Sequence, residues 1–132
     1  MNIIKRVKES VSIPVIASGD IVDRESLDRV KKYTNCDAFM IGRGALGSPE
    51  IFADLLDKHN PVSKIDTIKR HVKLLREYYP EQFISGHIRK HFLWYLKGYT
   101  GASAIKVQVS TEQSIDKVID VIDSFINSST NA

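Results

Sequence analysis

The chain has 132 residues, of which 42% are apolar and 27% are charged, a composition typical of a globular protein rather than a disordered one. No apolar run approaches the roughly 20 residues that span a bilayer, and the N-terminus lacks the apolar core of a signal peptide. The single cysteine, Cys36, excludes an internal disulfide and a cysteine zinc cluster. We therefore expect a cytoplasmic protein without a membrane segment or a metal site.

Positive charge is concentrated in the middle of the chain. Residues 1–61 hold 9 Lys and Arg against 9 Asp and Glu, residues 62–109 hold 9 against 3, and residues 110–132 hold 1 against 4. A basic block between a neutral segment and an acidic one favours a polyanionic partner. The alternative is a solvated helix surface that binds nothing.

Helices and strands alternate over the first 60 residues. Residues 2–10 have the apolar spacing of an amphipathic helix, and residues 13–17 predict a strand buried on both faces. Asp23 is a favourable N-cap for the next helix. Residues 38–41 predict a second buried strand, and a further helix is expected to open at Ser48–Pro49 with the proline in its first position.

This order predicts parallel strands with right-handed crossovers, and therefore an α/β sheet or barrel. Two strands do not make a stable sheet alone, and the chain starts with a helix that no strand precedes. We expect the end of a larger fold, whose remaining part, or self-association, covers the strands.

A helical segment follows a boundary at residues 59–63. We expect three helices: one that Pro80 ends, one from about Ser85 to Lys97 with Gly98 as its C-cap, and one that starts at Ser110 with a capping box. The third helix has an apolar stripe of Ile115, Val118, Ile119, Ile122 and Ile126. The chain is thus predicted to hold two domains, residues 1–60 and a small helical bundle over residues 61–132.

Glycines follow both predicted strands. Ser18, Gly19 and Asp20 follow the first strand, and Gly42 and Arg43 open a glycine-rich loop after the second. Ligands of parallel α/β folds bind beyond the C-terminal ends of strands, where glycines let backbone N–H groups approach a phosphate. The helix expected at residue 48 would add its positive end. These residues predict a phosphate site; the alternative is that the glycines only make tight turns.

Three motifs resemble the tRNA-dihydrouridine synthase family. They are IPVIASGDI at residues 13–21, DAFMIGRGALGSPEIF at residues 37–52 and HIRKHFLWYLKGYTGA at residues 87–102. The first motif is common among phosphate-binding barrels, whereas the combination of the other two is specific. The resemblance implies α/β architecture: the last strand–helix units of an FMN-binding (β/α)8 TIM barrel, followed by a helical tRNA-binding domain.

The resemblance also implies roles for individual residues. Gly19, Asp20, Gly42 and Arg43 fall where the family binds the FMN phosphate and ribityl chain. Ser18 replaces the asparagine that is usual there, which keeps a donor and an acceptor but loses reach. The family reduces uridine in tRNA with FMN and takes its electrons from NAD(P)H.

Basic residues of the helical half match the family's RNA-facing segment: Arg89, Lys90 and Lys97. Charge beside a phosphate backbone gives affinity that does not depend on sequence. We expect a second group of cations to extend this patch: Arg70, Lys73 and Arg76. Among the nearby aromatic residues, Phe92 and Tyr95 have the spacing of core residues, and Trp94 and Tyr99 are candidates for base stacking. His87 and His91 share a helix face but have no third ligand for zinc.

The family's catalytic cysteine belongs to an earlier barrel loop. Cys36 lies at the entrance of the second strand, opposite the catalytic face of a barrel, and we expect it to pack in the core. We therefore assign no catalytic residue here and expect the chain alone to be inactive. Two alternatives remain: a fragment of another FMN- or phosphate-binding TIM-barrel oxidoreductase, and a non-enzymatic RNA-binding module.

Overall fold

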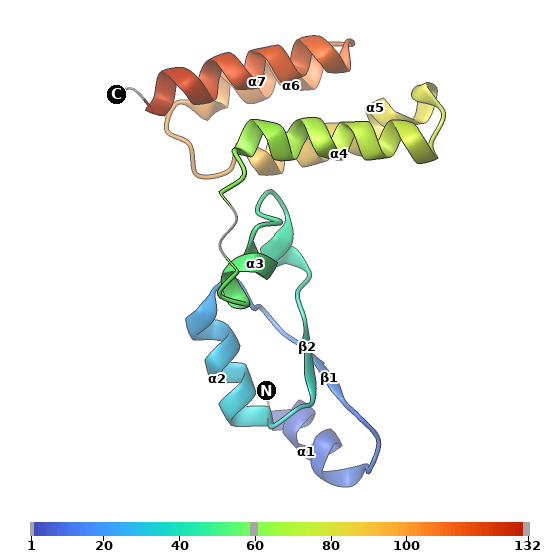
Figure 1. The fold of residues 1–132 in the computed structure, drawn as a ribbon, viewed down its shortest axis with the longest axis vertical. Coiled ribbons are helices and arrows are strands. Elements are labelled where there is room, and N and C mark those ends of the chain that lie inside the picture. Colours follow the sequence, from blue (N-terminus) through green and yellow to red (C-terminus); the bar gives the residue numbers. More distant parts are fainter. Residues whose placement is uncertain (1, 59–60, 131–132) are drawn as a thin grey trace. The chain divides into compact units, whose positions relative to one another are not determined.

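The structure is a computed structural model that describes residues 2–58 and 61–130. It divides into two compact units, Met1–Asn60 and Pro61–Ala132, called here the first and the second unit. The first unit contains α1 (Asn2–Ser10), β1 (Ile16–Ser18), α2 (Arg24–Thr34), β2 (Ala38–Met40), the 3-10 helix η1 (Arg43–Ala45) and α3 (Ile51–Leu55) (Figure 1). The second unit contains α4 (Lys64–Tyr78), α5 (Glu81–Tyr95), α6 (Ala102–Thr111) and α7 (Ile115–Thr130).

The predicted order of the first unit is confirmed, and its two strands are parallel. Ile16 pairs with Ala38 and Ser18 with Met40. The predicted N-cap of α2 is confirmed too: the Asp23 carboxylate accepts a 2.7 Å hydrogen bond from the Ser26 backbone N–H, and Ser26 Oγ accepts one of 3.0 Å from the Asp23 N–H. This reciprocal capping holds the chain as it leaves the loop after β1.

Asp37 ties together the N-terminal ends of the two strands, away from the loops that follow them. Its carboxylate accepts hydrogen bonds of 2.7 Å from Lys8 Nζ and 2.6 Å from the Val15 N–H. The hydrogen bond from Lys8, followed by that from Val15, lowers the pKa of Asp37 below its usual range. The contacts join α1, the start of β1 and the start of β2.

Within this chain the two strands are buried on one face only, whereas the sequence predicted burial on both faces in a larger fold. Ala17 is buried, but its neighbour Ile16 is 65% exposed and Met40 is 57% exposed. Successive strand residues point to opposite faces, and the described helices of this unit cover only one of them. The first strand also begins at Ile16, later than predicted. The buried residues of the unit are Ala17, Ile21, Val30, Cys36, Ile51 and Leu55, so Cys36 packs in the core as predicted.

The helix predicted to open at Ser48–Pro49 also differs. The chain first forms η1, and α3 begins only at Ile51 with Glu50 as its N-cap. Because α3 has only 5 residues, its helix dipole is too small to add appreciable positive potential at the loops that follow the strands.

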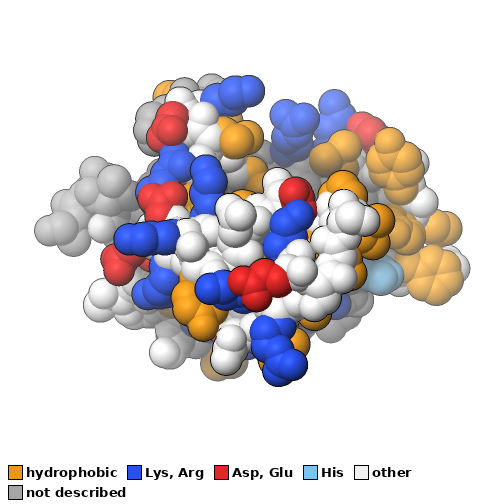
Figure 2. Space-filling view, turned by 90° about the horizontal axis from the view of Figure 1, so that it is seen from below, with side chains coloured by type: hydrophobic (Ala, Val, Ile, Leu, Met, Phe, Trp, Pro, Cys, Tyr) orange, Lys and Arg blue, Asp and Glu red, His pale blue; other side chains and the backbone are white. Residues whose placement is uncertain are grey.

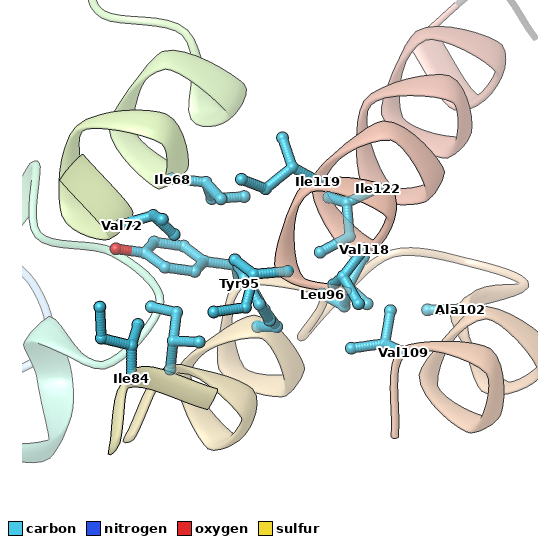
Figure 3. Close-up of a cluster of buried hydrophobic side chains, with 13 residues drawn as sticks. Ile68, Val72, Ile84, Tyr95, Leu96, Ala102, Val109, Val118, Ile119 and Ile122 are labelled. Atoms are coloured by element: carbon cyan, nitrogen blue, oxygen red, sulfur yellow. The ribbon is translucent and has the colours of Figure 1, made fainter. Parts of the chain in front are cut away.

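The second unit is a bundle in which α4 lies beside α5 and α6 beside α7 (Figure 1). Ile68 and Val72 of α4, Ile84 and Tyr95 of α5, and Ile122 of α7 meet in its core (Figure 3). The predicted stripe of α7 is confirmed: its first four members are buried and Ile126 packs against them. No helix of the described residues is long and apolar enough to cross a membrane.

Three boundaries in the second unit were predicted wrongly. The helix α5 begins at Glu81 instead of Ser85, and its C-cap is Leu96; Gly98 lies in the following turn with a φ of 90°. Ser110 is the penultimate residue of α6 instead of an N-cap, and its Oγ donates to the Lys106 carbonyl at 2.8 Å. A serine hydroxyl can bond either way, so the capping-box pattern did not distinguish the end of a helix from its beginning.

Candidate functional site

The loops after β1 and β2 leave the same edge of the sheet because the strands are parallel and in register. The five residues predicted from the sequence, Ser18, Gly19, Asp20, Gly42 and Arg43, line one hollow of about 270 Å³. Ile21, Val22, Met40 and Gly44 complete its lining. The structure therefore brings the predicted residues together at one place.

Gly44 explains how closely the two loops approach. A β-carbon at this position would overlap the backbone carbonyl oxygen of Ile21. In contrast, a β-carbon on Gly19 or Gly42 would meet nothing within 4 Å. Gly44 thus has a packing role that the sequence did not single out, whereas Gly19 and Gly42 leave free room beside the hollow.

Arg43 and Asp20 form an ion pair across the two loops. Arg43 Nη2 donates to Asp20 Oδ1, and both side chains are largely exposed, at 82% and 79%. An ion pair this exposed contributes little to stability, at most about 1 kcal/mol. Its effect is on orientation: Asp20 holds the guanidinium at the hollow. Within residues 2–58 and 61–130, the other N–H groups of Arg43 form no hydrogen bond that an anion would have to displace.

The donor set suits a phosphate and does not suit acid–base or nucleophilic chemistry. The hollow offers an arginine fork, a serine hydroxyl and glycine backbone with open space beside it. No cysteine or histidine lines it. Among the described residues, no three His, Cys, Asp or Glu side chains group to hold a metal ion.

Arg89 is not a free cation on the surface of the second unit. Its Nη1 donates to the backbone carbonyls of Val109 at 3.3 Å, Ser110 at 2.7 Å and Glu112 at 2.9 Å, and its Nη2 donates to Ser85 Oγ at 2.9 Å. The guanidinium therefore caps the C-terminal end of α6, where the orphan carbonyls of a helix favour a cation. Arg89 was expected to face RNA; these contacts point instead to a structural role.

Arg76 also differs from its expected role. It forms ion pairs with Glu81 at 3.1 Å and Asp116 at 3.0 Å, and the hydrogen bonds that it donates to Asp116 and then to Glu81 raise its pKa further. The remaining predicted cations are exposed: Arg70, Lys73, Lys90 and Lys97.

The histidines of α4 and α5 belong to a row of rings between the helices. The rings of His71 and His91 lie 4.8 Å apart, and His91 meets Trp94 edge-on at 4.9 Å. Burial lowers the pKa of both His71 and His91, with the neighbouring His71 a further cause for His91. Phe92 and Tyr95 are buried in the core, as predicted.

Comparison with known proteins decides the family. A family model described as "Dihydrouridine synthase (Dus)" matches residues 1–129. The chain belongs to the dihydrouridine synthase family. The resemblance drawn from the three motifs is confirmed.

Relatives of this dihydrouridine synthase chain are much longer than it is. The tRNA-dihydrouridine synthase B of Vibrio cholerae is 37% identical over 133 residues, which cover 94% of this chain and 41% of the relative. The protein of the same name from Pasteurella multocida is 42% identical over 104 residues, 72% of this chain and 31% of the relative. A probable tRNA-dihydrouridine synthase of Mycobacterium tuberculosis is 35% identical over 145 residues, 98% of this chain and 37% of the relative. The chain spans less than half the length of these proteins.

Proposed function

We propose that this chain is the C-terminal part of a flavin-dependent tRNA-dihydrouridine synthase. In this proposal residues 1–60 complete an FMN-binding TIM barrel, and residues 61–132 form a tRNA-binding helical domain. The observation that carries it is the meeting of Ser18, Gly19, Asp20, Gly42 and Arg43 in one hollow at the C-terminal ends of two parallel strands, where barrels of this architecture bind phosphate.

The exposed face of the sheet supports the same proposal. Ile16 and Met40 point away from the helices and are more than half exposed. Apolar strand residues with no cover are costly in water. Preceding strand–helix units, for which the length of the relatives leaves room, would bury them.

The hollow fits the phosphate end of FMN. Arg43 would hold the phosphate by its free N–H groups, Asp20 would orient Arg43, and the backbone at Gly19 and Gly42 would approach the anion without side-chain obstruction. Ser18 would hydrogen-bond the ribityl chain. FMN, when bound, supplies the hydride that reduces uridine to dihydrouridine, and NAD(P)H is the electron source in this proposal. The cysteine that donates a proton would come from the preceding part of the barrel.

A hybrid enzyme tests the proposal. The preceding part of the Vibrio cholerae relative is joined to this chain, and the purified protein is assayed for bound flavin by its visible absorption and for dihydrouridine formed in tRNA. We expect stoichiometric FMN and dihydrouridine from the hybrid, and neither from the 132-residue chain alone. A folded hybrid that binds no flavin would contradict the proposal.

Arg43→Ala in the hybrid tests the phosphate contact itself. Loss of one charge-assisted contact is expected to weaken FMN binding by roughly 10- to 100-fold. Arg29→Ala is the matched control, because Arg29 is an exposed arginine of α2 and does not line the hollow. Equal FMN affinity in the two variants would show that Arg43 does not contact the FMN phosphate.

A further inference from the structure

The outer side of α5 carries aromatic and cationic residues in one stripe. Phe83, His87, Lys90 and Trp94 fall within an arc of about 60° at the 100° spacing of an α-helix, and Lys97 follows in the turn after the helix. The other side of the same helix is the buried one and carries Ile84, Ile88, Phe92 and Tyr95. We call the first five residues the α5 stripe.

The stripe is accessible. Phe83 is 55% exposed, His87, Lys90 and Lys97 are exposed, and Trp94 is half-buried. The neighbouring helix α4 carries two more exposed side chains, Leu74 and Tyr78, the latter 77% exposed. Large aromatic side chains so far out of the core are unusual unless they serve a contact. Figure 2 shows hydrophobic side chains gathered around a histidine on one side of the molecule.

The segment that carries the α5 stripe contains no acidic residue. No Asp or Glu occurs from Gln82 to Thr111. Two cations of α4 are paired with carboxylates of α7: Lys69 with Asp123, and Arg76 with Asp116. Lys90 and Lys97 have no ion pair in the part of the chain that the structure describes. Unneutralised positive charge is therefore left on the stripe.

The rings beside the stripe are held in place before any ligand arrives. Trp94 meets His91 edge-on at 4.9 Å, His91 meets His71 at 4.8 Å, and Tyr79 lies 5.4 Å from His87. Burial lowers the pKa of His71 and His91, which favours their neutral forms and lets the two rings lie together at neutral pH. Rings that are already ordered lose little entropy when a partner stacks on them.

We propose that the α5 stripe binds unpaired nucleotides of RNA, with bases stacked on its aromatic rings and phosphates on Lys90 and Lys97. This inference rests on the proposed tRNA-binding function and narrows it to a single-stranded or looped segment. Interleaved rings and cations are what single strands need, because each base offers a ring face and each nucleotide a phosphate. A duplex hides its ring faces within the stack, so it would contact only the two lysines.

The fluorescence of Trp94 reports base stacking on the α5 stripe directly, because Trp94 is the only tryptophan in the chain. The 132-residue chain is titrated with a 12-nucleotide oligouridine and, separately, with a 12-base-pair RNA duplex, and the indole fluorescence is recorded beside an independent measure of binding. We expect the oligouridine to quench Trp94 and to bind more tightly than the duplex. The duplex is expected to bind weakly and to leave the fluorescence unchanged.

Two substitutions separate stacking from charge. Phe83→Ala should weaken oligouridine binding roughly 10-fold without changing its salt dependence, and Lys90→Ala should reduce the slope of log K against log salt by about 0.7. The matched controls are Val107→Ala, another exposed apolar side chain, and Lys117→Ala, another exposed lysine, both on other helices. Neither control should change affinity or quenching by the single strand.

The outcomes distinguish this inference from the function on which it rests. Equal binding of duplex and single strand, with no quenching and no effect of Phe83→Ala, would overturn the proposal that bases stack on the α5 stripe. It would remain compatible with tRNA binding through charge alone. Absence of binding to oligouridine, duplex and tRNA alike would overturn both. Quenching by oligouridine that Phe83→Ala weakens and Val107→Ala does not would support both.

Discussion

Arg89 Nη1 lies 2.7 Å from the backbone carbonyl oxygen of Ser110, 21 residues further along the chain. Through this bond and those to Val109 and Glu112, α5 holds the end of α6 and the turn into α7. Arg89→Ala should therefore destabilise the second unit by about 2 kcal/mol, the cost of leaving several carbonyls short of a charged donor. Thermal unfolding followed by Trp94 fluorescence measures the change.

RNA binding by folded Arg89→Ala protein should equal that of the parent chain, measured well below the melting temperature. Lys90→Ala serves as the comparison, because Lys90 is the next residue on the same helix and is exposed. If Arg89→Ala kept its stability and lost RNA affinity instead, Arg89 would be the phosphate contact that the sequence suggested.

Gly44→Ala should disturb the hollow between the two loops, because the new β-carbon would overlap the Ile21 carbonyl oxygen. The backbone rather than a flexible side chain must move, and we expect a loss of about 1–3 kcal/mol. Hydrogen exchange of the amides of residues 16–46 reports this loss locally. Gly42→Ala is the control, because its β-carbon has open space; equal exchange in the two variants would show that the loops do not need their close approach.

The second unit should lose stability as the pH falls from neutral. Burial lowers the pKa of His71 in the folded state, so the folded chain binds this proton less tightly than the unfolded chain, whose histidine pKa is about 6.5. The contribution of the neutral His71 ring to the free energy of unfolding is fully present above the unfolded pKa. It is lost as the pH falls from that value towards the lower pKa of the folded state. His91 adds to the effect in the same direction.

We expect the melting temperature of the second unit to fall by roughly 5 °C between about pH 7.5 and about pH 5.5. The double variant His71→Gln, His91→Gln should show a smaller fall over the same range. The same fall in parent and variant would assign the pH dependence to other groups.

The parts of the fold that local chemistry specifies were predictable from the sequence. Asp23 and Ser26 cap α2 by contacts three residues apart, and the stripe of α7 follows from helical spacing alone. The helix α6 was missed because Ile105, Val107 and Val109 are β-branched and give no clear helical face. Its start depends on packing of Ala102 and Val109 in the bundle core.

The candidate site was predictable as a set of residues, and the contacts among them were not. Strand order and glycine content were enough to place Gly19 and Gly42 together. The close approach of Gly44 to Ile21 and the capping by Arg89 depend on residues about 20 positions apart. The periodicity of the sequence carries no information on such distant pairs. It can place an arginine on the polar face of a helix, but it does not show that the guanidinium is already hydrogen-bonded within the protein.

Ser18→Asn should strengthen FMN binding in the hybrid enzyme. Ser18 lies at the end of β1 on the rim of the hollow, and its short hydroxyl reaches less far than the amide of an asparagine would. One additional hydrogen bond is worth roughly 2- to 10-fold in affinity, which flavin fluorescence titration resolves. Ser12→Asn, an exposed serine before β1 and outside the hollow, should leave the affinity unchanged. Identical FMN dissociation constants for Ser18→Asn and the parent hybrid would show that this side chain does not contact the flavin.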